Sequence, residues 1–221
     1  MSNKVRVWDL PTRIFHWTLV LCVISLVTTA KIGGAAMDWH FRLGYLVLAL
    51  LLFRLTWGFI GGRWSRFSTF LYSPATVFRY LRGQGAAELD IGHNPLGAGS
   101  VFAMLLFLLL QIATGLISDD EISASGPFTS LVSSSWVSRA TFYHSEIGQY
   151  VIFTLVGIHV CAILFYLWRK RLNLVRPMLF GDKELAQPAA SSRDDRLSRA
   201  LAAVVFVVCA SLVFLMLKFA P

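Results

Sequence analysis

The chain has 221 residues, of which 56% are hydrophobic and only 14% are charged, and its mean hydropathy is +0.64. Soluble domains carry roughly 25% charged residues, so this composition excludes an ordinary soluble protein and indicates a membrane protein built as one bundle. The net charge of +8 would suit nucleic acid. We expect no such partner, because the Lys and Arg residues concentrate in alternate loops, as the positive-inside rule predicts.

Five apolar runs are long enough to cross a membrane, which takes about 20 residues. None of them alternates with a period of two, so the runs predict helices rather than barrel strands. The expected fold class is therefore all-α and transmembrane. The expected spans are residues 14–32, 40–60, 96–117, 146–168 and 200–219.

The loop charges predict the orientation. The segment before the first run and the second and fourth connections are rich in Lys and Arg, whereas the opposite loops contain only Lys31 and Arg139. This places the N-terminus in the cytoplasm and the C-terminus outside. A cleaved signal peptide is the alternative for the first run, but that run is of full spanning length, with Arg13 just before it and His16 near its start.

Composition also predicts the domain organisation. Residues 182–199, rich in Ala, Ser, Pro and charge, predict a flexible cytoplasmic linker between a transmembrane domain (1–181) and a C-terminal transmembrane helix (200–221). That last helix either binds a partner or simply anchors the chain. Cys22, Cys161 and Cys209 lie in apolar runs and form no CxxC, which excludes a c-type haem and a cysteine-based metal cluster and favours plain packing.

Four of the five histidines lie at the ends of apolar runs, where a histidine is costly and needs a partner or a function. His144 and His159 share the fourth run, 15 residues apart, which means about 22 Å along a helix and within about 60° of one face. His16 opens the first run and His40 opens the second. The expected topology therefore pairs His16 with His159 near the cytoplasm and His40 with His144 near the outer surface.

Each pair offers two imidazoles and no other ligand, which is the set that a six-coordinate haem b requires. Iron with both axial positions filled transfers electrons rather than activating a bound substrate. Zinc or copper is a weaker alternative because carboxylates and thiols are missing, and a haem-free scaffold or transporter is the other. Gly44, Gly148 and Gly157 lie near the histidines and would let a haem approach the backbone, although helix packing explains any single glycine equally well.

Three arginines are candidate partners for the haem propionates, because a guanidinium group binds carboxylates bidentately. Arg13 and Arg54 are expected near the cytoplasmic haem and Arg42 near the outer one. Snorkelling at an interface is the alternative for Arg13 and Arg42. His93, just before the third run, is read as part of a loop and helix cap, with proton transfer to a quinone as the alternative.

These residues closely resemble the prokaryotic cytochrome b561 family, which is related to the b-type cytochrome subunits of membrane-bound hydrogenases. The resemblance covers about residues 4–181. The matching stretches are VWDLPTR and FHW (7–17), WHFRLGY (39–45), RLTWG (54–58), GHNPLGA (92–98) and the run from His144 to His159. The resemblance implies a four-helix haem-binding bundle in a bacterial inner membrane, with two haems b on the pairs His16/His159 and His40/His144. The fifth helix departs from the smallest members.

The resemblance also implies a function in respiratory electron transport. Members of the family pass electrons between the quinone pool and a second partner, here expected to be a periplasmic cytochrome c or a dehydrogenase- or hydrogenase-type subunit. A stand-alone superoxide:ubiquinone oxidoreductase is the alternative. The loop from Asp119 to Tyr143 opens with three acidic residues, which suits docking of a basic cytochrome c or merely a cover over the outer haem.

Overall fold

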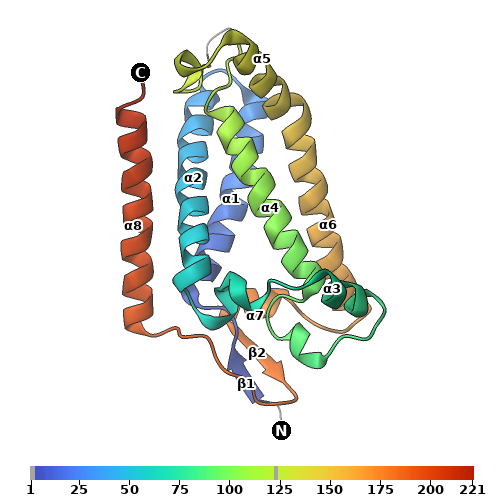
Figure 1. Cartoon of the computed structure of the whole chain (residues 1–221). Helices are drawn as coiled ribbons and strands as arrows, with labels where there is room; N and C mark the ends of the chain where they lie inside the picture. The colour runs from blue at the N-terminus through green and yellow to red at the C-terminus, as the bar shows by residue number, and fades with distance from the viewer. Residues whose placement is uncertain (1–2, 122–123) are drawn as a thin grey trace. The chain divides into compact units, whose positions relative to one another are not determined.

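The computed structural model describes residues 3–121 and 124–221, and Figure 1 labels their helices and strands. In this part of the chain, five helices are long and apolar enough to cross a membrane. They are α1 (Leu10–Ile32), α2 (Ala36–Ile60), α4 (Pro95–Gly115), α6 (Gln149–Trp168) and α8 (Arg196–Lys218). Their ends lie within about one turn of the expected ranges. The all-α transmembrane fold, with four helices and a fifth at the C-terminus, is thereby confirmed.

Side chains that accept hydrogen bonds from free backbone N–H groups define where two of these helices begin. Asp9 Oδ1 accepts from the Thr12 N–H at 2.8 Å at the start of α1. Asn94 Oδ1 accepts from the Gly97 N–H at 2.8 Å at the start of α4, where Pro95 occupies the first helical position. Such caps replace a bond that the first turn lacks. The cap expected just before the third apolar run is thereby confirmed.

The chain divides into two compact units. The first unit comprises Met1–Trp17, Phe53–Phe102 and Ile158–Val205, and the second unit comprises Thr18–Leu52, Ala103–Gly157 and Phe206–Pro221. Each unit therefore contains one of the expected histidine pairs.

In the first unit, a short antiparallel sheet joins segments far apart in the sequence. Strand β1 (Asn3–Arg6) pairs with β2 (Asp182–Leu185), as Figure 1 shows. The Ser192 N–H also donates to the Arg6 carbonyl at 2.7 Å. Backbone hydrogen bonds therefore hold part of the segment that composition predicted to be a flexible linker. The boundaries at residues 181 and 199 stay a prediction.

A buried carboxylate organises the polar centre of the first unit. Asp9 is fully buried, and it accepts hydrogen bonds from the Thr12 N–H, Ser65 Oγ, the Gly62 N–H and Trp57 Nε1 at 2.8 to 3.3 Å. A buried carboxylate is tolerated only when donors replace its water. Asp9 therefore ties the start of α1 to the end of α2 and the turn after it.

The remaining elements are short. They are η1 (Arg63–Ser65), η2 (Phe67–Thr69), α3 (Pro74–Leu81), η3 (Ala87–Asp90), η4 (Thr129–Leu131), α5 (Ser134–Phe142), the π-helical η5 (Tyr143–Gly148) and α7 (Val175–Phe180). The stretch before α6 was expected to be a loop as far as Tyr143. It is partly helical, and α5 continues through η5 into α6.

Candidate functional site

The four predicted histidines lie in two pairs, one in each unit. In the first unit, the ring centroids of His16 on α1 and His159 on α6 are 6.5 Å apart, with ring planes at 49°. In the second unit, the rings of His40 on α2 and His144 in η5 are 6.2 Å apart, with planes at 83°. Two imidazoles that share one metal ion, with bonds of about 2 Å each, have centroids about 6 Å apart. Each pair is therefore spaced for one ion between its rings.

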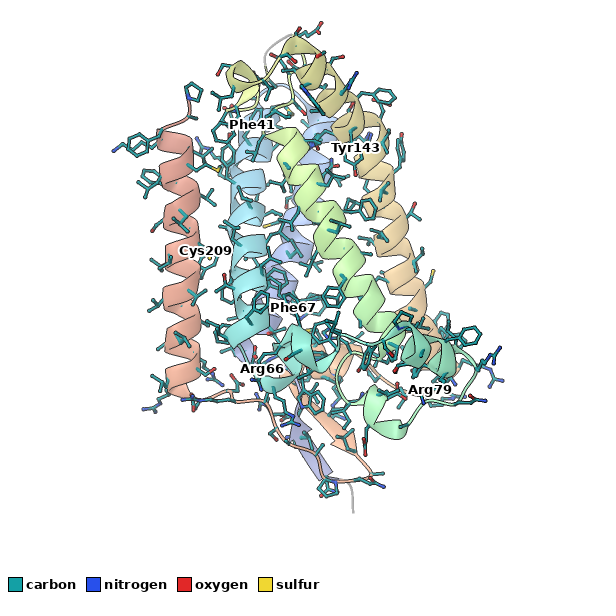
Figure 2. All side chains as sticks on the ribbon, viewed as in Figure 1. Phe41, Arg66, Phe67, Arg79, Tyr143 and Cys209 are labelled. Atoms are coloured by element: carbon teal, nitrogen blue, oxygen red, sulfur yellow. The ribbon has the colours of Figure 1, made fainter. Side chains whose placement is uncertain are left out.

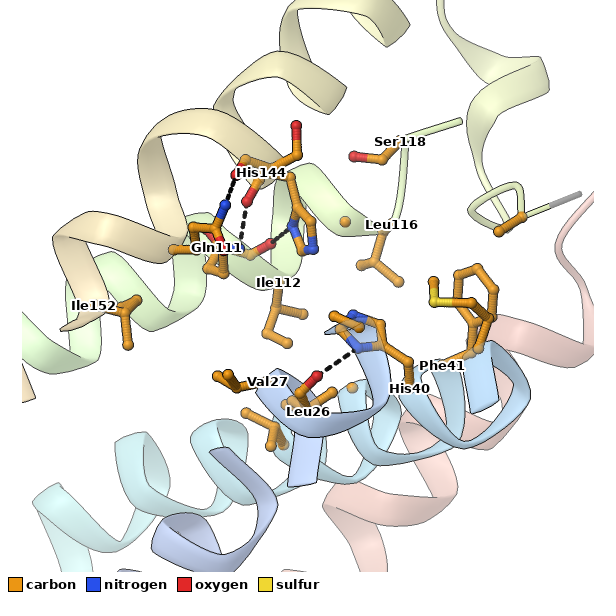
Figure 3. Close-up of a pocket in the computed structure, with 18 of the residues that line it drawn as sticks. Leu26, Val27, His40, Phe41, Gln111, Ile112, Leu116, Ser118, His144 and Ile152 are labelled. Carbon is orange, nitrogen blue, oxygen red and sulfur yellow. Dashed lines mark hydrogen bonds between the residues drawn. The ribbon is translucent and has the colours of Figure 1, made fainter. Parts of the chain in front are cut away.

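Backbone carbonyls fix the proton positions in the His40–His144 pair. His40 Nδ1 lies 3.0 Å from the carbonyl oxygen of Leu26, and His144 Nδ1 lies 2.9 Å from that of Gln111, as the dashed lines in Figure 3 show. A carbonyl oxygen only accepts, so each Nδ1 carries the proton and donates it. Nε2 of each ring then keeps a free lone pair, which is the form of histidine that binds a metal.

The π-helical segment η5 and two glycines set the position of His144. π-Helical turns are rare and occur frequently at functional sites. Gln111 Nε2 donates to the His144 carbonyl at 2.9 Å, and a Cβ on Gly115 would lie 2.7 Å from His144 Cε1. Gly115 therefore makes room for the imidazole, a role that the sequence reading missed. A Cβ on Gly148 would meet the Gln111 side chain, which agrees with the helix-packing explanation that the sequence left open for this glycine.

A cavity of about 430 Å³ lies beside His40 and His144 in the second unit. Its walls are mainly apolar, and Figure 3 shows the two imidazoles among the lining side chains. Gly44 also lines it, and a Cβ built there would meet no atom within 4 Å. Lys31 is the cation among the lining residues. The lining also includes three carboxylates, Asp119, Asp120 and Glu146, so Lys31 gives it no excess of positive charge. The space and the two imidazoles fit a large, mostly apolar group.

Arg54 supplies a buried positive charge in the first unit. It is 3% exposed, and its guanidinium carbon lies 4.7 Å from the ring centroid of Phe67, which Figure 2 labels. Within the described residues, Arg54 Nη1 and His16 Nδ1 are buried without a hydrogen-bond partner. Buried polar atoms are normally paired, so these two atoms fit a polar or anionic ligand in this unit.

The other two predicted arginines have partners of a different kind. Arg13 donates to the Leu179 carbonyl at 2.7 Å and lies 3.9 Å from Asp194. Arg42 is exposed and lies over the Trp39 ring at 5.3 Å, and it is not part of the cavity lining. The structure therefore brings Arg54, but not Arg42, into a buried setting, and it adds Lys31 as a cation beside the His40–His144 pair.

His93, the fifth histidine, packs between two aromatic rings. Its ring centroid lies 4.6 Å from that of Trp8 and 4.5 Å from that of Phe70. Its Nδ1 is buried without a hydrogen-bond partner among the described residues. His93 interacts electrostatically with Arg54, His16 and His159. It belongs to neither histidine pair.

The residues grouped at each pair limit the kind of metal group that they fit. In residues 3–121 and 124–221, no three His, Cys, Asp or Glu side chains are grouped to hold a bare metal ion. The two imidazoles of each pair would hold a metal ion together with a group that supplies its other ligands, such as a porphyrin. Membrane-spanning helices with such histidine pairs are typical of b-type cytochromes, which are haem proteins of electron transport. The model of the family described as prokaryotic cytochrome b561 matches residues 7–181, and the chain belongs to this family.

Curated relatives include three hydrogenase-associated subunits. The probable Ni/Fe-hydrogenase 1 B-type cytochrome subunit of Escherichia coli (strain K12) is 30% identical over 139 residues, which covers 49% of this chain and 57% of the relative. Probable Ni/Fe-hydrogenase B-type cytochrome subunits of Bradyrhizobium diazoefficiens and Rhodobacter capsulatus are 24% and 26% identical, covering 81% and 88% of this chain and 86% and 84% of theirs. No solved structure gives a significant match. The match thus spans little more than half of the E. coli subunit.

Proposed function

We propose that the chain binds two haems b, one between His16 and His159 and one between His40 and His144, and passes electrons between the quinone pool and a periplasmic redox partner. The observation that carries this proposal is the spacing of the two imidazole pairs, 6.5 and 6.2 Å between ring centroids. Haem supplies one-electron iron chemistry when it is bound. The two histidines of each pair would hold the haem iron between them and leave a substrate no place on it.

The residues around each pair have separate tasks. The Leu26 and Gln111 carbonyls orient His40 and His144 and keep Nε2 unprotonated. Buried Arg54 offers a positive charge to a propionate or a quinone oxygen in the first unit. Arg13 and Arg42 remain weaker propionate candidates, because each already has another contact.

A hydrogenase-type subunit is the favoured partner because the relatives carry that description. A cytochrome c is the other candidate. The proposed setting is a bacterial inner membrane with the N-terminus in the cytoplasm, which the loop charges support. The pairing of β1 with β2 requires both strands on one side of the membrane, and the four spanning helices between them, α1, α2, α4 and α6, are an even number, as this requires.

The first test is haem quantification and a reduced-minus-oxidised spectrum of the purified protein. We expect two haems b per chain with the low-spin spectrum of bis-histidine iron. One haem, or none, would overturn the two-site proposal. Replacing His93, which belongs to neither pair, with Phe should leave both haems in place and serves as the matched control.

The second test concerns the electron donor and acceptor. In proteoliposomes, we expect a quinol to reduce both haems rapidly and an added hydrogenase or oxidised cytochrome c to exchange electrons with them. Fast reduction by superoxide, with quinone turnover and no partner protein, would instead favour the stand-alone oxidoreductase.

A further inference from the structure

A second cavity lies in the first unit, at the turn after α6. Its volume is about 530 Å³, and it is bounded by that turn, by α7 and by the β1–β2 sheet. Neither His16 nor His159 lines it. The charged residues that do are four cations, Lys4, Arg171, Arg176 and Lys183, and two carboxylates, Asp182 and Glu184. Lys183 Nζ donates to the Asp90 and Ile91 carbonyls, which lie outside the lining, and this leaves the other three cations to the cavity.

The two carboxylates do not neutralise these three cations. Asp182 lies 3.3 Å from Lys4, but Arg6, which is outside the lining, holds the other oxygen of Asp182 at 2.5 Å. Glu184 lies 4.0 Å from Arg176, and these side chains are 63% and 69% exposed. Exposed pairs at this distance interact weakly. The cavity therefore keeps an excess of positive charge.

Arg171 occupies a backbone conformation that favours glycine. Its φ is +57°, and the Leu172 N–H donates across it to the Tyr166 carbonyl at 2.9 Å, which closes the end of α6. A side chain at such a position costs backbone energy that glycine would avoid. Arg171 also forms no ion pair with any residue of the described ranges. The guanidinium group of Arg171 is therefore left without an anionic partner from the described part of the chain.

The cavity borders the membrane end of α6. Trp168, the last residue of α6, is 68% exposed, and Trp is typical of the membrane–water interface. Leu172 and Phe180 line the cavity beside the arginines and are also exposed. Cations and apolar side chains thus meet in one cavity at the end of a spanning helix. Basic pockets at such ends bind anionic lipid headgroups.

We propose that this cavity binds the headgroup of an anionic phospholipid, with the phosphodiester at Arg171 and Arg176 and the acyl chains along Leu172 and Phe180. Asn173 fixes the start of α7, where Arg176 lies. Its Oδ1 accepts hydrogen bonds from the N–H groups of Val175 and Arg176 at 3.0 and 2.9 Å. The headgroup would then join α6, α7 and the sheet of the first unit.

The test uses the full chain, purified in a maltoside detergent and delipidated. Phosphatidylglycerol, phosphatidylcholine, inorganic phosphate and an oligoglutamate peptide are added separately. Retained lipid is read by native mass spectrometry and stability by thermal unfolding. We expect phosphatidylglycerol alone to bind and stabilise, with about fivefold weaker binding for each arginine removed by Arg171→Gln and Arg176→Gln. The matched control is the pair Arg169→Gln and Lys170→Gln, which removes two charges at the same helix end outside the lining.

A further variant separates folding from binding. Arg171→Gly places glycine at the left-handed position, so the lipid-free protein should be at least as stable as the parent. Its affinity for phosphatidylglycerol should nevertheless fall about fivefold. The proposal is overturned by unchanged phosphatidylglycerol binding in both Arg171 variants, by equal protection from phosphatidylcholine, or by equal protection from phosphate or oligoglutamate.

Discussion

The two histidine pairs consist of the same side chains in different surroundings. In the His40–His144 pair, backbone carbonyls accept from both Nδ1 atoms, and a mainly apolar cavity lies alongside. In the first unit, His16 Nδ1 is buried without a partner among the described residues, and the buried charges of Arg54 and Asp9 belong to the same unit. One pair is thus oriented by hydrogen bonds and the other lies among fixed charges. Hydrogen bonds and nearby charges are the means by which proteins tune haem potentials, so two chemically distinct haems are expected.

The largest effect should come from removing one ligand. His40→Ala should abolish the haem of its own pair and leave that of His16–His159, and His16→Ala should do the converse, because each pair has its own two imidazoles. Haem quantification and redox titration measure both outcomes. Loss of both haems from either variant would show that the pairs are not independent.

Arg54→Met should produce the next largest effect. It removes a buried cation whose charge acts on the buried Asp9 carboxylate, which should lower the free energy of unfolding. The potential of the haem at His16–His159 should also fall, because a positive charge favours the reduced form. Arg42→Met, on the same helix but exposed, should change neither quantity. A shift confined to the other haem would contradict the assignment.

Gly115→Ala should disturb only the His40–His144 pair. The added Cβ would lie 2.7 Å from His144 Cε1 and push the imidazole away from the Gln111 carbonyl. Changes to groups that orient a metal ligand typically cost about 10–100-fold in affinity. Retention of that haem during dialysis is the measurement. Gly99→Ala, on the same helix with nothing within 4 Å of the new Cβ, should retain both haems.

Replacement of Asp194 should have the smallest effect on the free energy of unfolding. It tests whether the stability of the first unit depends on this carboxylate at acid pH. Burial alone would raise the pKa of Asp194, but hydrogen bonds from Arg199 and the Leu10 N–H, with the charges of Arg199 and Arg6, hold it below the ordinary value of 3.8. The stabilisation is therefore complete above pH 3.8 and is lost as the pH falls through the lower folded value.

Asp194→Asn should lower the free energy of unfolding by about 1 kcal/mol at pH 7 and flatten its dependence on pH below 4. Thermal unfolding between pH 3 and 7 measures this, with Glu184→Gln, at a 63% exposed side chain, as the control. An equally steep loss of stability in acid for Asp194→Asn would show that other groups cause it.

Hydropathy and histidine spacing predicted the parts of the molecule that depend on local sequence. The five helices follow from apolar length. The pairing of the four histidines follows from the order of the spans, and the observed 6.2 and 6.5 Å separations agree with it. Their assignment as haem ligands stays a prediction. The helix cap at Asn94 could be predicted because an Asn directly before a Pro is a local sequence signal for the start of a helix.

The features that sequence reading missed depend on contacts between distant residues. No local pattern shows that Asn3–Arg6 pairs with Asp182–Leu185. Each strand has only four residues, and its pairing depends on a segment far away in the sequence. The same holds for Gly115, whose need for a missing Cβ arises from a histidine on another segment. The π-helical segment η5 could not be predicted from a helical periodicity of 100° per residue, because a π-helix departs from that periodicity.

The β1–β2 sheet has a consequence for how the chain is made. The ribosome releases β1 first, and its partner strand leaves only after α1, α2, α4 and α6 have been synthesised. At about 5–20 residues per second this delay is on the order of 10–40 s. During that time the N-terminal segment has no strand to pair with and stays open to chaperones and proteases. Closure of the sheet is thus a late event, and it can occur only in chains whose intervening helices have returned β2 to the side of the membrane where β1 remained.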